Sequence, residues 1–374
     1  LGVSIYHDGK VRTFASGSGC VLLNKIALLR SNVLPLYDRP KFIKSLLNLI
    51  DTAKRNPKEL EATTVRHWAS KQGLNKRVTD LYMTVARATN TCADKYMTSV
   101  LELGLHLARG LDSNNTITCP IGGFGEIHRR LANRITENKG KIHLEAKVDQ
   151  IIFENNTATG VKIGEEIYES DYVIAAMPAK ILWSNLIDKK AILDGIDENK
   201  RSELEAYTKK CELIKANSGL CLDMILNTKD YKERSLIIHP HDQMPSIMCI
   251  ISNTDESITK QGTSYLTFLG LVEFNDLKDN KEKYINLAKS IIDQAYPGIS
   301  RHNIGSRHLF LNVIDGAEVN AKQEQSMRPS SLIPCIENLF NPSDDKREGH
   351  SGVEEIAAGA SIAVYKHILK KEEP

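Results

Sequence analysis

Near its C-terminus the sequence combines a short apolar strand, an acidic turn and a helix rich in small residues, and this combination limits the possible folds. The strand and turn read Asn338-Leu339-Phe340-Asn341-Pro342-Ser343-Asp344, and the helix begins near Ser351-Gly352-Val353-Glu354. Ser351 and Glu354 have capping-box spacing, which predicts a defined helix start with free backbone N–H groups. Such a start suits an anion or the electron-rich edge of a ring. Taken alone, the segment is more typical of a small-residue helix packed on a sheet.

This segment resembles the C-terminal flavin motif of the amine oxidase and phytoene desaturase superfamily, in which a strand ends in Gly-Asp before a Gly-rich helix start. The resemblance implies that Asp344 holds the ribityl and pyrophosphate region of FAD. It also implies that the backbone N–H of Val353, between Gly352 and Glu354, points at the N1/O2 edge of the flavin. That donor would stabilise the negative charge of the reduced flavin. Ser343 replaces the glycine of the family, which changes the tightness of the turn.

A second block, from Cys119 to Pro178, strengthens the resemblance. It contains a Pro-x-Gly-Gly turn, a helix, two strands joined by an Asn-Asn turn, and a final apolar strand. The apolar residues Phe124, Ile127, Leu131 and Ile135 have helical spacing. Strands are predicted at 141–145, 148–154, 158–163 and 171–178. The continuous apolar run of the last strand predicts burial on both of its faces. The resemblance assigns the adenine contact to the backbone of Val148. It also places Pro178, at the end of the last strand, among the cofactor-binding residues.

The family also has a βαβ unit whose G-x-G-x-x-G turn seats the FAD pyrophosphate, and the sequence opens in what resembles the region after that unit. The nearest match, 123–128, has His128 where the third glycine must allow close packing, and Pro120 interrupts the preceding strand. A turn of the substrate domain explains this segment better. We therefore expect a chain that is N-terminally incomplete relative to the family, with weak FAD binding and reduced activity as it stands.

The remaining sequence predicts helices and an antiparallel sheet. Predicted elements are a hairpin around Asp8-Gly9 in 1–20, helices in 39–115, β-rich sequence in 214–274, and a helix over 281–296 stopped by Pro297-Gly298. The expected fold class is α/β, with an incomplete FAD-binding Rossmann-like domain of the glutathione-reductase type and an interleaved α+β substrate domain. The predicted FAD-binding pieces are 1–20, 117–190 and 300–374, and the predicted substrate domain is 21–116 and 191–299.

Composition and charge exclude several classes of protein. The 374 residues are 41% hydrophobic and 26% charged, and a net charge of +2 without basic, aromatic-interleaved runs argues against nucleic-acid binding. Seven scattered cysteines without C-x-x-C spacing are typical of reduced thiols in a cytoplasmic protein. The apolar face from Phe42 to Ile50 favours a core helix, but its flanking basic residues leave a peripheral membrane contact open.

Other charged and titratable residues predict less chemistry. The histidines at 239, 241, 302 and 308 have no carboxylate at ligand spacing, so they favour solvated surface positions over a metal site. The run Lys346-Arg347-Glu348 is typical of a charged loop, but its place between the two flavin-contacting elements leaves a position at the border of the cofactor open. The absence of a G-x-S-x-G elbow disfavours a serine hydrolase.

The resemblance implies an FAD-dependent oxidoreductase that abstracts hydride from a small apolar substrate, an isoprenoid of the kind used in carotenoid biosynthesis. No catalytic acid or base follows from spacing, and no metal is expected. The alternatives are a protoporphyrinogen- or amine-oxidase-type flavoenzyme and a non-catalytic remnant of the flavin fold. Amine oxidases need an aromatic cage, so an aromatic content of 6% mildly favours an aliphatic substrate.

Overall fold

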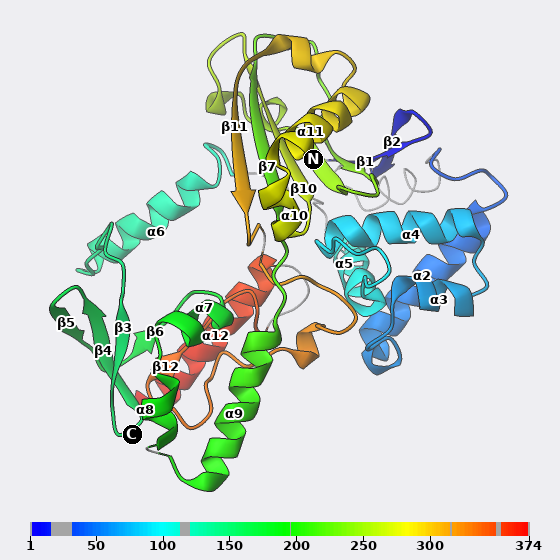
Figure 1. Ribbon diagram of the computed structural model, residues 1–374. Coiled ribbons are helices and arrows are strands. Elements are labelled where there is room, and N and C mark those ends of the chain that lie inside the picture. Colours follow the sequence, from blue (N-terminus) through cyan, green and yellow to red (C-terminus); the bar gives the residue numbers. More distant parts are fainter. Residues whose placement is uncertain are drawn as a thin grey trace. The chain divides into compact units, whose positions relative to one another are not determined.

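The computed structural model describes residues 2–15, 32–112, 120–194, 196–314, 316–348 and 353–372. The chain forms two compact units, each with helices and strands (Figure 1). Unit 1 comprises Leu1–Ile142, Asn217–Asp315 and Val319–Ala321, and unit 2 comprises His143–Ala216, Gly316–Glu318 and Lys322–Pro374. The mixed α/β architecture confirms the predicted fold class.

Unit 1 is built on a seven-stranded mixed sheet with the order β11-β7-β10-β9-β8-β1-β2. Its strands are β1 (Gly2–His7), β2 (Lys10–Ala15), β7 (Gly219–Leu226), β8 (Ser235–His239), β9 (Ser246–Ile250), β10 (Ser264–Leu271) and β11 (Asn303–Leu311). Only the β1–β8 pair is parallel among these neighbours. Asp8 and Gly9 have φ values of 49° and 75°, the positive angles of a tight hairpin turn, so the predicted hairpin is confirmed.

The two faces of this sheet have different covers, because successive side chains of a strand point to opposite faces. On one face Leu222, Met224 and Phe268 are buried with residues of α11 (Lys281–Ala295), which follows α10 (Phe274–Asp279). On the other face Ile5 and Ile238 belong to the core of a helical group. That group contains α2 (Arg39–Arg55), α3 (Val65–Lys71), α4 (Lys76–Thr89) and α5 (Val100–Asp112). The β7, β10 and β11 part of this second face is more exposed, and we call it the open sheet face.

The helical group confirms the predicted helices of the first third of the chain. Phe42, Leu46 and Leu49 are buried in its core, whereas Leu47 is exposed. The apolar face of α2 is therefore mainly a core face. Among the residues that the structure describes, no helix is long and apolar enough to cross a membrane.

Unit 2 holds two small sheets. Parallel β6 (Val173–Ile174) and β12 (Leu339–Phe340) form one, and β3 (Gln150–Glu154), β4 (Thr157–Ile163) and β5 (Glu166–Glu169) form an antiparallel one. The helices of unit 2 are α7 (Ala179–Asn185), α8 (Lys189–Asp194), α9 (Glu198–Leu213) and α12 (Val353–Glu372). Its core includes Leu182, Trp183, Leu204 and Leu339. Unit 2 also contains the short 3-10 helix η5 (Gln325–Met327), and the 3-10 helices of unit 1 are η1 (Pro57–Glu59), η2 (Ile251–Asn253), η3 (Glu256–Ile258) and η4 (Ile299–His302).

Two predicted strands were wrong. Residues 141–145 form no strand, and 171–178 contribute only the two residues of β6, of which Ile174 is 54% exposed. The predicted helix exists as α6 (Gly125–Glu137), but its apolar positions from Phe124 to Ile135 are exposed. The common reason is that an apolar pattern reports propensity, while a strand or a buried face requires a partner.

The packing units divide the sequence differently from the predicted domains. β1 and β2 join the sheet of unit 1 although 1–20 was assigned to the FAD-binding domain, and residues 191–216 lie in unit 2. The units are defined by packing and not by what they bind. The assignment of cofactor and substrate pieces therefore stays a prediction.

Candidate functional site

The carboxyl ends of β6 and β12 meet at one edge of unit 2, because the two strands are parallel neighbours. Ligands of open α/β sheets bind at such carboxyl ends. The Nδ2 of Asn341, directly after β12, donates to the carbonyl oxygens of Ala175 at 2.6 Å and Met177 at 2.8 Å, directly after β6. This bridge fixes the strand ends and brings the segment leading to Pro178 beside the segment that continues into Ser343.

Asp344 is half-buried at this edge, and its carboxylate lies against the backbone. Its Oδ2 accepts a hydrogen bond from the N–H of Ala317 at 2.9 Å. A Cβ added to Gly316 would lie 1.6 Å from that oxygen, so glycine is required for this close approach. Burial and the neighbouring carboxylate of Asp345 raise the pKa of Asp344 above its usual value. The carboxylate retains acceptor capacity for hydroxyl donors, which fits the ribityl chain of FAD.

Two charged residues after Asp344 were not predicted as part of the site. Asp345 is buried and accepts hydrogen bonds from the N–H of Ala179 at 2.6 Å and from the hydroxyl of Ser343. Lys346 is 0% exposed, and its Nζ lies 3.3 Å from Oδ1 of Asp345. Within the described part of the chain this Nζ has no hydrogen-bond partner. The run 346–348 was predicted as a charged loop, and the structure shows that Lys346 within it is buried.

The other predicted cofactor residues are not brought to this edge by contacts that the structure describes. Val148 is half-buried and packs against the hydrophobic core of unit 2. Gly352 lies outside the described residues. Val353 and Glu354 are the first two residues of α12. Their assignments to adenine and flavin stay predictions.

The open sheet face of unit 1 carries a buried carboxylate that is already neutralised. Oδ2 of Asp223 on β7 accepts hydrogen bonds from Nε and Nη2 of Arg307 on β11, at 3.1 Å and 2.6 Å. Its Oδ1 accepts a hydrogen bond from Thr267 on β10 at 3.0 Å. Burial and then the charge of Asp223 raise the pKa of Tyr265, on the same face, to about 12. Asp223 is the single acidic residue in β7, β9, β10 and β11.

Apolar side chains surround this charged pair on the open sheet face. By strand alternation Ile225 and Cys221 of β7 lie on the face with Asp223. Leu269 of β10 and Leu309 of β11 both pair with Cys221, so they lie on this face too. Ile225 and Leu309 are exposed, and Leu269 is half-buried. The face can therefore hold an apolar molecule beside a neutral ion pair.

The histidines differ from expectation at one position. His239 is 4% exposed and stacks on Tyr6, with ring centroids 4.4 Å apart. Its Nε2 lies 3.2 Å from Oε1 of Gln294, and burial lowers its pKa to about 4. The surface interpretation was wrong for this residue. In the described ranges no group of three or more His, Cys, Asp or Glu side chains could hold a metal ion.

Comparison with known proteins gives one match to a family and several to solved structures. Residues 22–195 match the family described as flavin containing amine oxidoreductase. The fold is similar to an oxidoreductase from Methanosarcina mazei, with a TM-score of 0.73 and 15% identity over 98% of this chain and 81% of that chain. It is also similar to a redesigned putrescine oxidase, with a TM-score of 0.65 and 11% identity over 99% and 81% of the two chains.

A third similar structure is the cyclohexylamine oxidase from Brevibacterium oxydans IH-35A. Its TM-score is 0.65, with 14% identity over 100% of this chain and 81% of that chain. At these identities the likeness concerns the fold. No protein of curated function matches the chain in sequence.

Proposed function

We propose that the chain is a flavin-containing oxidoreductase that uses FAD and oxidises an apolar substrate at a C–H bond. FAD, when bound, supplies the acceptor for the hydride that leaves the substrate. In this proposal the carboxyl edge of β6 and β12 holds the cofactor, and the open sheet face holds the substrate. An isoprenoid is the substrate class that we favour.

At the cofactor edge the chain supplies acceptors and a fixed backbone. Asp344 would accept hydrogen bonds from ribityl hydroxyls, and the N–H of Ala317 holds its carboxylate in place. The buried pair of Asp345 and Lys346 keeps the turn in one conformation, because separating either charge from its partner would leave it unpaired away from water. These residues orient the cofactor and need no proton transfer.

The neutralised carboxylate of the open sheet face carries the proposal for the substrate. A cationic amine would need a free carboxylate, and Asp223 is already held by Arg307 and Thr267. Binding an amine there would break an existing ion pair. An uncharged apolar chain gains from the neighbouring leucines without that cost.

Anaerobic reduction of the bound flavin tests this proposal. The FAD-loaded protein is mixed with phytoene in detergent, putrescine or cyclohexylamine, and bleaching of the flavin absorbance is followed with mass analysis of the product. We expect bleaching with phytoene and a product that lacks two hydrogen atoms. Bleaching by the amines alone would refute the substrate class and favour the amine oxidase alternative, to which the fold likeness also points. Stable flavin with every compound would favour a non-catalytic protein.

A further inference from the structure

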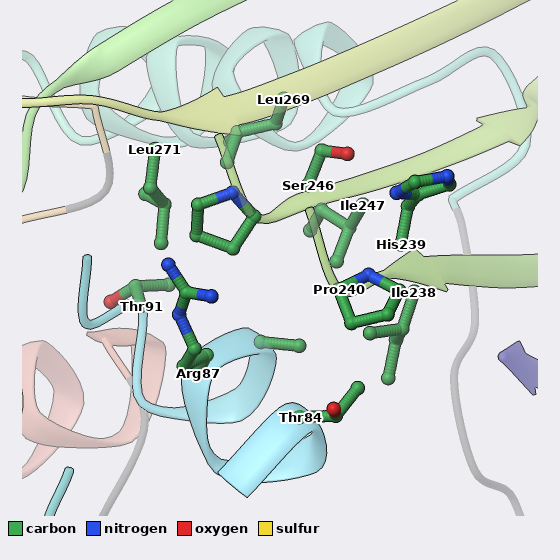
Figure 2. A pocket seen from close by; sticks show the side chains of 12 residues that line it. Thr84, Arg87, Thr91, Ile238, His239, Pro240, Ser246, Ile247, Leu269 and Leu271 are labelled. Carbon is green, nitrogen blue, oxygen red and sulfur yellow. The ribbon is translucent and has the colours of Figure 1, made fainter. Parts of the chain in front are cut away.

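We propose that a cleft in unit 1, between α4 and strands β8 to β10, binds an organic acid with an apolar chain (Figure 2). Arg87 projects from α4 into this cleft. Ile238, Ile247, Leu269 and Leu271 form its apolar wall. The inference goes beyond the flavin reaction, because binding of the acid requires neither the cofactor nor turnover.

The guanidinium of Arg87 is a buried charge that contacts no carboxylate in the described part of the chain. The side chain is 5% exposed, and its hydrogen bonds go to three backbone carbonyls. These acceptors belong to Ala93 at 2.8 Å, Asp242 at 3.2 Å and His241 at 3.5 Å. The carboxylate of Asp242 is engaged elsewhere, 2.7 Å from Nζ of Lys95. A buried charge is costly unless it is paired, so this site favours an anionic ligand.

Arg87 also keeps donors for such a ligand. A guanidinium has five N–H donors, and the three carbonyl bonds leave two of them, including the one on Nε. The Nε is buried without a hydrogen-bond partner among the residues that the structure describes. Figure 2 shows the side chain rising from α4 into the centre of the cleft, below Leu269 and Leu271. Charge-assisted bonds to a carboxylate would satisfy these donors.

The apolar lining of the cleft selects the rest of the ligand. The enclosed part of the cleft offers about 10 Å³ to the centre of a water-sized sphere, which is room for about one such group, for example a carboxylate oxygen. The whole cleft has about 340 Å³ of empty space, including the part open to solvent. An alkyl chain leaving Arg87 would lie against Leu269 and Leu271, where burial of each methylene is favourable. A medium-chain carboxylic acid combines these features.

Calorimetric titration of the FAD-loaded wild-type protein with octanoate and with 1-octanol tests the inference. We expect octanoate to bind about tenfold more tightly or better, because only the acid forms charge-assisted bonds with Arg87. Equal affinities would overturn the inference. So would a lack of octanoate binding, which would leave the cleft to a water molecule only.

Two variants and a control locate the binding. Arg87→Met should weaken octanoate binding about tenfold or more and leave octanol binding unchanged. Lys71→Met is the control, because it removes an exposed cation of α3 that does not line the cleft, and octanoate affinity should remain that of the wild type. Arg87 also holds backbone carbonyls, so the fold of its variant is checked by circular dichroism. Leu269→Phe narrows the apolar wall without altering Arg87 and should also weaken octanoate binding. An unchanged affinity in that variant would overturn the inference independently.

Discussion

Replacement of His239 by phenylalanine should abolish a pH dependence of stability that is built into unit 1. The imidazole is buried between Tyr6 and Gln294, and burial lowers its pKa from the ordinary 6.5 to about 4. The two pKa values differ by about 2.5, and a difference of one in pKa corresponds to a free energy of about 1.4 kcal/mol. Protonation of His239 at low pH therefore stabilises the unfolded state relative to the folded state by about 3 kcal/mol.

The sign of the effect follows from which state binds the proton first. Between pH 6.5 and pH 4 the unfolded chain is protonated at this histidine and the folded chain is not. The contribution of His239 to stability is thus complete above pH 6.5 and is lost as the pH falls towards 4. By pH 4.5 the loss should reach about 2.5 kcal/mol. Burial also lowers the pKa of His241, but that residue is unchanged in the variant and its effect cancels in the comparison.

Urea unfolding followed by tryptophan fluorescence measures the effect in the correct unit. The chain has two tryptophans, so a Trp183→Phe background leaves Trp68, which lies in the core of unit 1, as the reporter. In that background His239→Phe keeps an aromatic ring beside Tyr6 and cannot titrate. Between pH 7.5 and pH 4.5 the parent should lose about 2.5 kcal/mol more stability than the variant.

The exposed His67 on α3 provides the matched control, and His67→Phe should retain the pH dependence of the parent. Parallel stability curves for the parent and His239→Phe would refute the reasoning. That result would mean that water reaches His239 in the folded state and that its burial does not disfavour the proton.

Four further predictions concern the cofactor edge, the open sheet face and the helical core. Asp344→Ala should weaken FAD binding by about 1.5–3 kcal/mol, measured by titration of the protein with FAD, and an unchanged affinity would make Asp344 a turn residue only. Val353→Pro at the first residue of α12 should leave the melting temperature near that of the parent, because proline is tolerated there. The same variant should make the flavin potential more negative, and equal potentials would show that this N–H is not aimed at the flavin. Arg307→Met should expose the carboxylate of Asp223 and confer calorimetrically measurable putrescine binding, whereas no gain would contradict its neutralisation by arginine. Tyr82→Phe should cost about 1 kcal/mol in urea unfolding, because it removes a buried hydroxyl with two hydrogen bonds, and no loss would show that they contribute nothing net.

Much of the fold could be predicted because its signals are local. The hairpin at Asp8-Gly9 and the turn at Asn155-Asn156 both have residues that tolerate positive φ, and both turns are observed. The helix that ends before Pro297 was predicted with the stop signal Pro297-Gly298, and α11 confirms it. The order of strand, acidic turn and helix at the C-terminus was likewise readable, with β12 and α12 at the predicted places.

The burial of charged and polar side chains could not be predicted from the sequence. The run containing Lys346 has the composition of a surface loop, and only the position of the run after β12 buries that side chain against Asp345. His239 is similar, because its neighbours Tyr6 and Gln294 come from β1 and α11, far away in the sequence. Burial of a polar side chain depends on which segments pack around it. The spacing of residues within a single segment does not show which other segments will pack around it.

The ionic state of Asp223, and with it the expected substrate, also depends on which segments pack together. In sequence it is a lone acid within an apolar strand, and a reader seeking an amine oxidase would assign it to bind the ammonium group. The partner that prevents this, Arg307, is on β11 and becomes its neighbour only because β11 pairs with β7 across 84 positions of sequence. A free carboxylate would predict a cationic amine as the substrate, whereas a carboxylate paired with arginine predicts an uncharged apolar one. The preference for an apolar substrate therefore depends on strand pairing, and breaking the Asp223–Arg307 contact is the change that should reverse it.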